Sequence, residues 1–371
     1  MAPTVKDILA CLDAAHPFAW ALAEDRVGLQ VGDPQAEVTT ILVALEATLA
    51  VLAQAKAQQA QLLLTHHPLL YQAAADIRED RAAGKLLAAA VRARLAVVSC
   101  HTNLDLAPGG LNDYLAHKLG LEDLEVLAPV RQDAWLKLAV FVPVGYEEQV
   151  RAALLDDRVG VIGCYSHCSF AARGQGTYRP LAGASPFRGE VSALSRADES
   201  RLEVLVPESC LAPTLARLRA AHPYEEVAYD LYPLANPGLT LGFGRVGRWP
   251  ENLAWEEAVP RIKEVFAVHR FRVWGRPPAA ISRAAVCGGS GGDLIAQAQG
   301  KGASLYITGE VRHHQAVPAP DGNFAVIEVG HFASEVVFMP AWAELVAQHL
   351  RQRELAVQVR VAAEDPPFQI L

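Results

Sequence analysis

The sequence predicts an α/β protein in two parts, a discontinuous core domain with a mixed or mostly parallel sheet and a smaller inserted α+β domain. Three observations lead to this prediction. The chain has 371 residues, more than one hydrophobic core usually organises. Short strands that are apolar on both faces alternate with helices, a pattern typical of a sheet covered on both sides. This alternation stops near Pro129 and returns near Gly242, so we assign residues 1–128 and 240–371 to the core domain and residues 129–239 to the insertion.

Both parts of the core domain show the same alternation of strands and helices. In the N-terminal part, β-branched and leucine-rich runs predict strands at residues 38–44, 61–65 and 95–99. Helical spacing of apolar residues predicts helices there at residues 5–12, 47–60, 84–94 and 111–119. In the C-terminal part, we expect strands at residues 284–287, 304–307 and 324–329, helices at residues 255–266, 294–299 and 334–350, and a short further segment at residues 311–316.

The insertion contains two copies of one short pattern, an apolar strand that ends in proline and leads into a helix. Residues 140–143 precede a predicted helix at 146–155, and residues 204–207 precede one at 209–220. The strands of the insertion are predicted at residues 135–144, 164–172, 201–206 and 227–232. A duplicated β-α-β unit predicts a ferredoxin-like sandwich. Residues 177–194 are assigned to neither a helix nor a strand.

Composition and charge exclude several classes of protein. Hydrophobic residues make up 51% of the chain, which argues against disorder. No apolar run is long enough to cross a bilayer, and the first residues do not resemble a secretion signal. The six cysteines are scattered, so we expect free thiols in a reducing cytoplasm. The net charge of −8 disfavours nucleic-acid binding, because a protein that neutralises phosphates needs a basic face.

Three of the predicted strands end in side chains that bind metals. The first is followed by His66 and His67, the second by His101 and Asp105, and the third by His331 and Glu335. The carboxyl ends of parallel strands share a crevice, where imidazoles supply terminal ligands and carboxylates can bridge two ions. Each pair alone also has a structural explanation as a strand cap or turn. The coincidence of three such pairs predicts a metal site.

Several motifs resemble the family called GTP cyclohydrolase 1 type 2 homologues, or NIF-three-like proteins. In the core domain they are His66-His67-Pro68-Leu69, His101-Thr102-Asn103-Leu104-Asp105, Thr308-Gly309-Glu310, and Gly330-His331 followed by Glu335. In the insertion they are residues 174–181 (Gly-Gln-Gly-Thr-Tyr-Arg-Pro-Leu) and 222–230 (His-Pro-Tyr-Glu-Glu-Val-Ala-Tyr-Asp). The resemblance covers nearly the whole chain and points to the longer bacterial members. Two positions depart from the family, which commonly has Asp in place of Glu310 and an aromatic residue in place of His313.

The resemblance implies a site for two divalent metal ions. The implied ligands are His66, His67, Asp105, His331 and Glu335, with Glu335 bridging the two ions. It also implies a toroidal homohexamer with the metal sites facing its central cavity. The ligand types do not choose among Zn, Mn, Fe and Mg. His101 and His314 belong to the same motifs and are candidates for orienting ligands, facing the substrate or moving protons, with a purely structural role as the alternative.

Two metal ions with open positions activate water, so the resemblance implies a metal-dependent hydrolase that acts on a nucleotide or another phosphorylated small molecule. Two alternatives remain open: a non-enzymatic ring that stores or delivers metal, and a scaffold that binds partner proteins. The glycine-rich turn at residues 288–292 opens a helix and either cradles an anion or simply makes a tight turn. It lacks the Lys-Ser/Thr ending of a nucleotide-binding P-loop.

Overall fold

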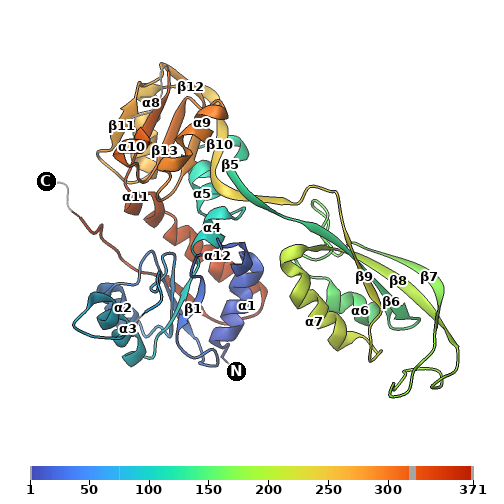
Figure 1. The fold of residues 1–371 in the computed structure, drawn as a ribbon. Coiled ribbons are helices and arrows are strands. Elements are labelled where there is room, and N and C mark those ends of the chain that lie inside the picture. Colours follow the sequence, from blue (N-terminus) through green and yellow to red (C-terminus); the bar gives the residue numbers. More distant parts are fainter. Residues whose placement is uncertain (1, 75, 317–322, 369–371) are drawn as a thin grey trace. The chain divides into compact units, whose positions relative to one another are not determined.

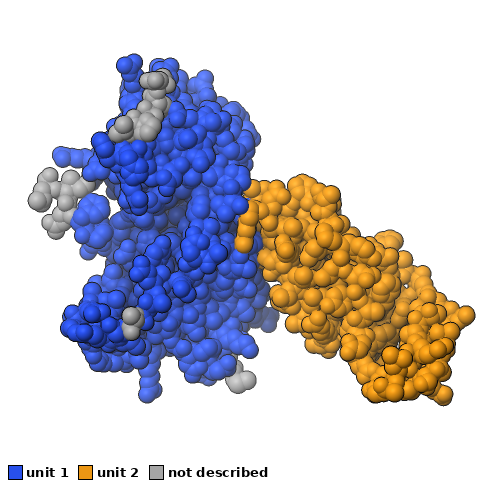
Figure 2. Space-filling model, viewed as in Figure 1, with its two compact units in different colours: residues 1–130, 241–371 blue, residues 131–240 orange. Residues whose placement is uncertain are grey.

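The chain forms two structural units, shown in Figure 2. The structure is a computed structural model and describes residues 2–74, 76–316 and 323–368. The first unit contains residues 1–130 and 241–371, and the second contains residues 131–240. The first is an α/β unit and the second an α+β unit, which confirms the predicted fold class.

A five-stranded sheet forms one part of the first unit (Figure 1). Its strands, in spatial order, are β1 (Gly28–Val31), β4 (Ala96–Ser99), β3 (Leu62–Thr65), β2 (Thr40–Ala44) and β15 (Gln358–Val361). All neighbouring pairs are parallel except β1 with β4. Helices cover both faces, because the central strands β2, β3 and β4 are buried on both sides. The residues of one face pack against α2 (Leu49–Ala57) and α3 (Ala82–Arg92), and those of the other pack against α1 (Val5–Ala15) and α12 (Met339–Gln352).

A six-stranded sheet forms the other part of the first unit. Its strands, in spatial order, are β11 (Arg272–Gly275), β14 (Ala325–Glu328), β13 (Leu305–Thr308), β12 (Ala280–Cys287), β10 (Leu239–Ala254) and β5 (Glu122–Asp133). The central strands β12, β13 and β14 are parallel, and β10 and β11 pair antiparallel with them. The associated helices are α8 (Trp255–Val265), α9 (Ile295–Gly300) and α10 (His313–Ala316), with short 3-10 helices at Gly292–Leu294 and, near the N-terminus, at Phe18–Trp20.

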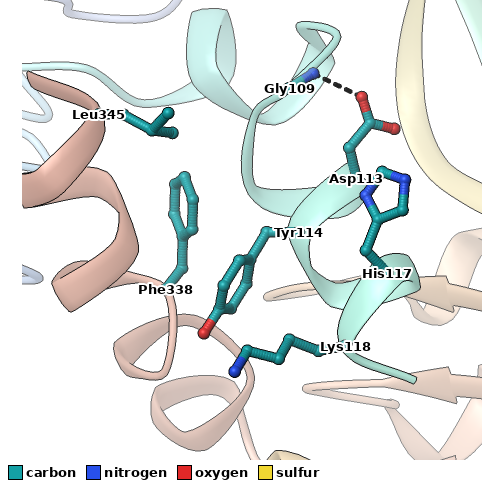
Figure 3. Close-up of a pocket in the computed structure, with 7 residues that line it drawn as sticks. All are labelled: Gly109, Asp113, Tyr114, His117, Lys118, Phe338 and Leu345. Atoms are coloured by element: carbon teal, nitrogen blue, oxygen red, sulfur yellow. Dashed lines mark hydrogen bonds between the residues drawn. The ribbon is translucent and has the colours of Figure 1, made fainter. Parts of the chain in front are cut away.

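The two sheets share one hydrophobic core, which runs through the helices α4 (Thr102–Leu106), α5 (Leu111–Lys118), α11 (His331–Val336) and α12. On α5, the ring of Tyr114 faces that of Phe338 (Figure 3), with 5.2 Å between the ring centres. The hydroxyl of Tyr114 donates to the carbonyl of Val337 at 3.0 Å. The two rings and Leu345 border a shallow pocket of about 330 Å³. These contacts fix α5 against the junction between α11 and α12, and therefore fix the direction of α11.

The second unit is a ferredoxin-like sandwich, as its duplicated pattern predicted. Its elements are β6 (Trp135–Pro143), α6 (Glu147–Leu154), β7 (Ser169–Tyr178), β8 (Ser195–Pro207), a 3-10 helix (Glu208–Cys210), α7 (Leu211–Ala221) and β9 (Tyr229–Pro233). The antiparallel strands have the order β7-β8-β6-β9. Valine and leucine side chains of β6 and β8 face the two helices and form a separate core.

The structure departs from the sequence prediction at several elements. The strands β1, β5, β10, β11 and β15 were not predicted, and the strand predicted at residues 164–172 lies at Ser169–Tyr178. Glycines in β10 lower its apparent strand propensity, but a Cβ atom on Gly242 would lie 2.2 Å from the carbonyl oxygen of Ala128, so glycine permits close packing there. The helix predicted at residues 334–350 is two helices, with Pro340 in the first turn of the second.

Candidate metal centre

Six side chains converge where strands of the two sheets end. The histidines at positions 66 and 67 directly follow β3, and His101 and Asp105 follow β4. His331 and Glu335 lie on α11, which follows β14 in the other sheet. The sharp turn between β14 and α11 uses Gly330, whose φ is 103°. The sequence analysis expected a single sheet edge, but the site forms where the ends of two sheets meet within the first unit.

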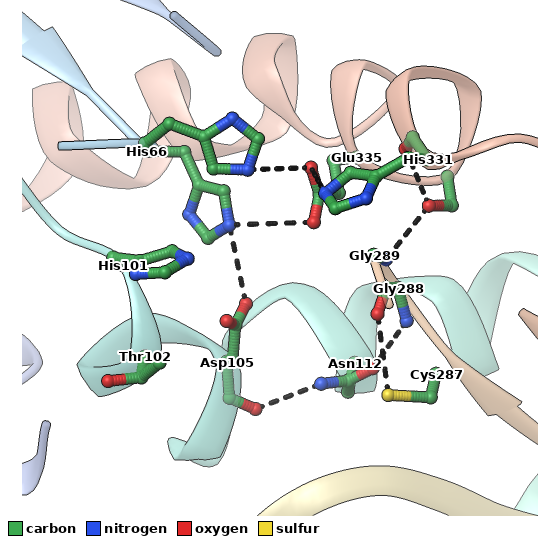
Figure 4. Close-up of polar contacts among 12 residues, drawn as sticks. His66, His101, Thr102, Asp105, Asn112, Cys287, Gly288, Gly289, His331 and Glu335 are labelled. Carbon is green, nitrogen blue, oxygen red and sulfur yellow. Dashed lines mark hydrogen bonds and ion pairs between the residues drawn. The ribbon is translucent and has the colours of Figure 1, made fainter. Parts of the chain in front are cut away.

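The carboxylate of Glu335 lies at the middle of this cluster (Figure 4). Its Oε2 atom is 3.1 Å from Nε2 of His67 and 3.3 Å from Nε2 of His331. Its Oε1 atom faces the other side, 3.9 Å from Nε2 of His66, which is itself 3.5 Å from Oδ1 of Asp105. The two carboxylate oxygens therefore face two different groups of ligand atoms.

Each of the four histidines has one ring nitrogen held by a neighbouring oxygen atom, which leaves the second nitrogen free to face the cluster. The Nδ1 atoms face oxygen acceptors: Cys100 O for His66 (3.0 Å), Glu46 Oε1 for His67 (3.3 Å), Asp25 Oδ1 for His101 (2.9 Å) and Glu310 Oε2 for His331 (3.2 Å). Such contacts fix the orientation and tautomer of an imidazole and leave Nε2 for a metal. Proteins commonly orient metal-binding histidines in this way.

The centre of the cluster is buried and incompletely paired. His66 is fully buried, Glu335 is 3% exposed and Asp105 is 8% exposed. Nε2 of His66, Oδ1 of Asp105 and Oε2 of Glu335 have no hydrogen-bond partner of acceptable geometry among the described residues. Buried polar atoms without a hydrogen-bond partner are costly unless a ligand is bound. This donor set fits divalent cations.

Two groups of donor atoms satisfy the spacing of a metal site within the described chain. They are His66, His67 and His101, and His67, His331 and Glu335; the donor atoms of each group lie within 4.8 Å of one another. The buried His and Glu side chains can therefore hold metal ions. His101, which was expected to orient the ligands or face the substrate, is therefore also a candidate metal ligand.

Burial and mutual contacts shift the pKa values of the side chains in this cluster. Burial lowers the pKa of His66 to about 3 and raises the pKa of Asp105 to about 7. Burial opposes a charge on His67, but its contacts with Glu335 and Glu46 outweigh burial and raise its pKa to about 10. Contact with Glu335 likewise raises the pKa of His331 to about 9. The carboxylate of Glu335 thus attracts positive charge, whether protons or metal supply it.

A cavity of about 830 Å³ opens beside the cluster. Aromatic side chains line part of its wall: Tyr71, Phe243, Phe332 and Phe368. The turn at Gly288 and Gly289 forms another part, and a Cβ atom on Gly289 would come within 2.4 Å of Oε1 of Glu335. The glycine turn therefore makes room for the central carboxylate, which favours the tight-turn interpretation of this motif.

The end of the described chain closes one side of this cavity. Glu364 accepts hydrogen bonds from the backbone N–H groups of Leu45 (2.6 Å) and Glu46 (3.0 Å). Pro367 and Phe368, which follow, line the cavity. The C-terminal segment is therefore tied to the same loop that carries the partner of His67.

The other catalytic candidate, His314, does not join the site. It is an exposed residue of α10 and is not among the residues that line the cavity. Two partners of the histidines, Asp25 and Glu46, were not predicted from the sequence. The position of Glu46 just after strand β2 was an available signal, whereas the loop around Asp25 carries no recognisable pattern.

Comparison with known proteins identifies the family. A model of the Duf34/NIF3 (NGG1p interacting factor 3) family matches residues 3–367. The chain belongs to the NIF3 family. A NIF3 relative from Bacillus subtilis, named GTP cyclohydrolase 1 type 2 homolog, is 36% identical over 99% of this chain and 98% of its own length. One of the same name from Mycobacterium tuberculosis is 38% identical over 99% and 97%.

Solved NIF3 structures share the fold. The crystal structure of a Bacillus cereus protein related to NIF3 superimposes with a TM-score of 0.86 at 34% identity, over the full length of both chains. Among the described residues, no helix of this NIF3 protein has both the length and the apolar character needed to cross a membrane.

Proposed function

We propose that this NIF3 protein is a metal-dependent hydrolase that holds two divalent metal ions with His66, His67, Asp105, His331 and Glu335. The observation that carries the proposal is the convergence of buried imidazole nitrogens and carboxylate oxygens on the Glu335 carboxylate, where three such atoms have no hydrogen-bond partner of acceptable geometry among the described residues. Its Oε1 side, with His66 and Asp105, forms one ligand set, and its Oε2 side, with His67 and His331, forms the other. A shared carboxylate between two such sets is the arrangement of a bridging ligand.

When bound, the two ions lower the pKa of a coordinated water and polarise the substrate. The residues of the chain orient the ligands and move protons. Glu46, Asp25 and Glu310 fix the imidazole rings. His101, held by Asp25, presents its other ring nitrogen to the same group and is positioned to accept or return a proton.

The cavity suggests a class of substrate. No Lys or Arg side chain lines its described wall, so the cations must neutralise an anionic group of the substrate. The aromatic side chains provide flat apolar surface suited to a heterocyclic base. These features, with the name that curated relatives carry, support a nucleotide or a related phosphorylated small molecule.

Turnover by metal-loaded protein tests the proposal. Purified chain, reconstituted separately with Zn²⁺, Mn²⁺, Fe²⁺ or Mg²⁺, is assayed against nucleoside triphosphates including GTP, and against simple phosphoesters. We expect turnover that needs the metal, is lost in Asp105→Asn and persists in Asp33→Asn, a matched change at an exposed aspartate. Full metal occupancy without turnover over this panel contradicts the hydrolase proposal.

One observation favours a second candidate function, the storage or delivery of metal. The side chain of His331 is 38% exposed, so one ligand lies at the solvent side of the site, where incoming ligands can replace it. Rapid metal transfer to a chelator or an acceptor protein, without turnover, supports this alternative. The homohexameric ring remains a prediction, which light scattering of the purified chain tests.

A further inference from the structure

The second unit contains a cavity of its own, with a volume of about 330 Å³. It lies between the end of β7, the loop that follows it, strand β8 and the loop before β9. The two segments of the insertion that the sequence analysis singled out, residues 174–181 and 222–230, both contribute to its lining. Distant motifs of the insertion thus meet at one concave site, whose volume is at the lower end of small-molecule pockets.

Aromatic rings form and brace one side of this cavity. The rings of Phe187 and Tyr224, which both line it, lie 5.8 Å apart, and Tyr146 meets Phe187 edge-on at 5.6 Å from behind the lining. The hydroxyl of Tyr178, a third lining ring, donates to the carbonyl of Arg188 at 2.7 Å and ties the loop to the end of β7. The aromatic surface is therefore held in place before any ligand arrives.

Three carboxylates share the cavity with these rings: Glu199, Glu225 and Glu226. Glu199 accepts a hydrogen bond from the hydroxyl of Tyr224 through Oε1 at 2.9 Å. A Cβ atom on Gly176 would lie 2.2 Å from its other oxygen, so the glycine on the neighbouring strand leaves space for the carboxylate. Glu225 accepts from the backbone N–H of Ser185 at 2.8 Å, which anchors it to the loop.

The described residues carry more negative than positive charge at this cavity. The ion pairs of the second unit use other acids, namely Glu148, Asp133, Glu203 and Asp156. Among the described residues, Arg179 lines the cavity and the guanidinium of Arg188 lies 5.5 Å from the centre of the Phe187 ring, against three carboxylates. Carboxylates and aromatic faces around one space are the two features that attract an organic cation, through charge and through the ring quadrupole.

We propose that this cavity binds a small organic cation, an ammonium or guanidinium group on an apolar body. The cation lies against the Glu199 carboxylate, and the apolar body packs against the rings of Phe187 and Tyr224. An anion of the same shape meets an excess of negative charge and is rejected. The proposal is independent of the metal centre, because every residue it uses belongs to the second unit.

Calorimetric titration of the full chain tests this inference with three probes of one shape: 3-phenylpropan-1-amine, the neutral 3-phenylpropan-1-ol and the anionic 3-phenylpropanoate. We expect the amine to bind at least about tenfold more tightly than the alcohol, and the carboxylate not to bind, because a charge-assisted contact contributes about that factor. Added NaCl should weaken binding of the amine.

Variants locate the binding site. Glu199→Gln keeps an acceptor for Tyr224 but removes the charge, and we expect it to weaken amine binding about tenfold. Glu226→Gln, at an exposed side chain, is a second charge-removing variant that serves if the first fails to fold. Glu190→Gln, in the same loop but outside the lining, should leave affinity unchanged. Equal binding of all three probes, no binding of the amine at about 10 mM, or an unchanged affinity in both lining variants overturns the proposal.

Discussion

The cavities of the two units differ in what their polar atoms lack. In the first unit, imidazole nitrogens and carboxylate oxygens are buried together, and three of them have no hydrogen-bond partner in the part of the chain that the structure describes. In the second unit, Glu199 and Glu225 already accept hydrogen bonds from Tyr224 and Ser185. The first site therefore needs small cations that several atoms can approach at once, whereas the second needs only a diffuse positive charge against rings and carboxylates. The same acidic chemistry gives different ligands because the neighbouring side chains differ.

The largest expected effect is the loss of metal from the first unit when the central carboxylate is removed. Glu335→Ala deletes both oxygens that face the two ligand groups, so we expect the purified protein to lose at least one metal equivalent per chain. Elemental analysis of the protein measures this loss. Glu344→Ala, at an exposed helical glutamate, is the matched control and should keep the full metal content. Retention of all metal by Glu335→Ala contradicts the bridging role.

The pH dependence of metal binding should be the next largest effect. In the metal-free protein, His67 and His331 have pKa values of about 10 and about 9, so both carry protons at neutral pH. A metal must displace these protons, so apparent affinity should rise with pH by up to about 100-fold per unit and level off above about pH 10. Calorimetry in buffers of different ionisation enthalpy measures the protons released. Binding without proton release would show that these imidazoles are not ligands.

Weakening the contact that orients one imidazole should have a smaller effect on metal affinity. Glu46→Gln replaces the carboxylate that faces Nδ1 of His67 with an amide, and we expect metal affinity to fall about tenfold. Competition with a fluorescent chelator measures the affinity. The exposed Glu37, changed to Gln, provides a control on the same segment. An affinity equal to that of the control would mean that Glu46 does not orient the ring.

The smallest expected effect is a change in hydrogen exchange, which distinguishes the responses of the two units within one sample. Removing metal with EDTA should speed hydrogen exchange at the ends of β3 and β4 while leaving residues 174–181 unchanged. Adding 3-phenylpropan-1-amine should slow exchange at residues 174–181 and 222–230 only. Mass spectrometry of peptides reads both responses. A response of both units to either treatment would show that the sites are coupled.

Much of the fold was predictable because local pattern and tertiary structure agree. The strands β2, β3 and β4 are continuous apolar runs buried on both faces, so their sequences identify them without knowledge of their partners. In contrast, β15 is short and mostly exposed, and it pairs in parallel with β2, more than 300 residues away in the chain. Its alternation of valine with polar residues was an available strand signal, but four residues give that signal little weight without knowledge of the partner strand.

The candidate site divides in the same way. His66 and His67 directly follow β3, and His101 follows the neighbouring parallel strand β4, so their convergence could be predicted from strand polarity. His331 follows β14 of the other sheet, so strand polarity did not predict its approach. The residues that hold the histidine rings could not be predicted either, because Asp25 lies in an irregular loop 76 residues before its partner. His314 was included through its motif, but only the structure shows that its side chain is exposed and lies outside the residues that line the cavity.

The position of Phe368 has a practical consequence for anyone preparing this protein. That ring lines the large cavity of the first unit. A polyhistidine affinity tag joined to the chain after this ring would start beside the cavity, and it would bring extra imidazoles, and the nickel they carry from a purification column, to the metal centre. Elemental analysis of such a preparation would count the metal of the tag with that of the protein, so the tag belongs at the other end of the chain.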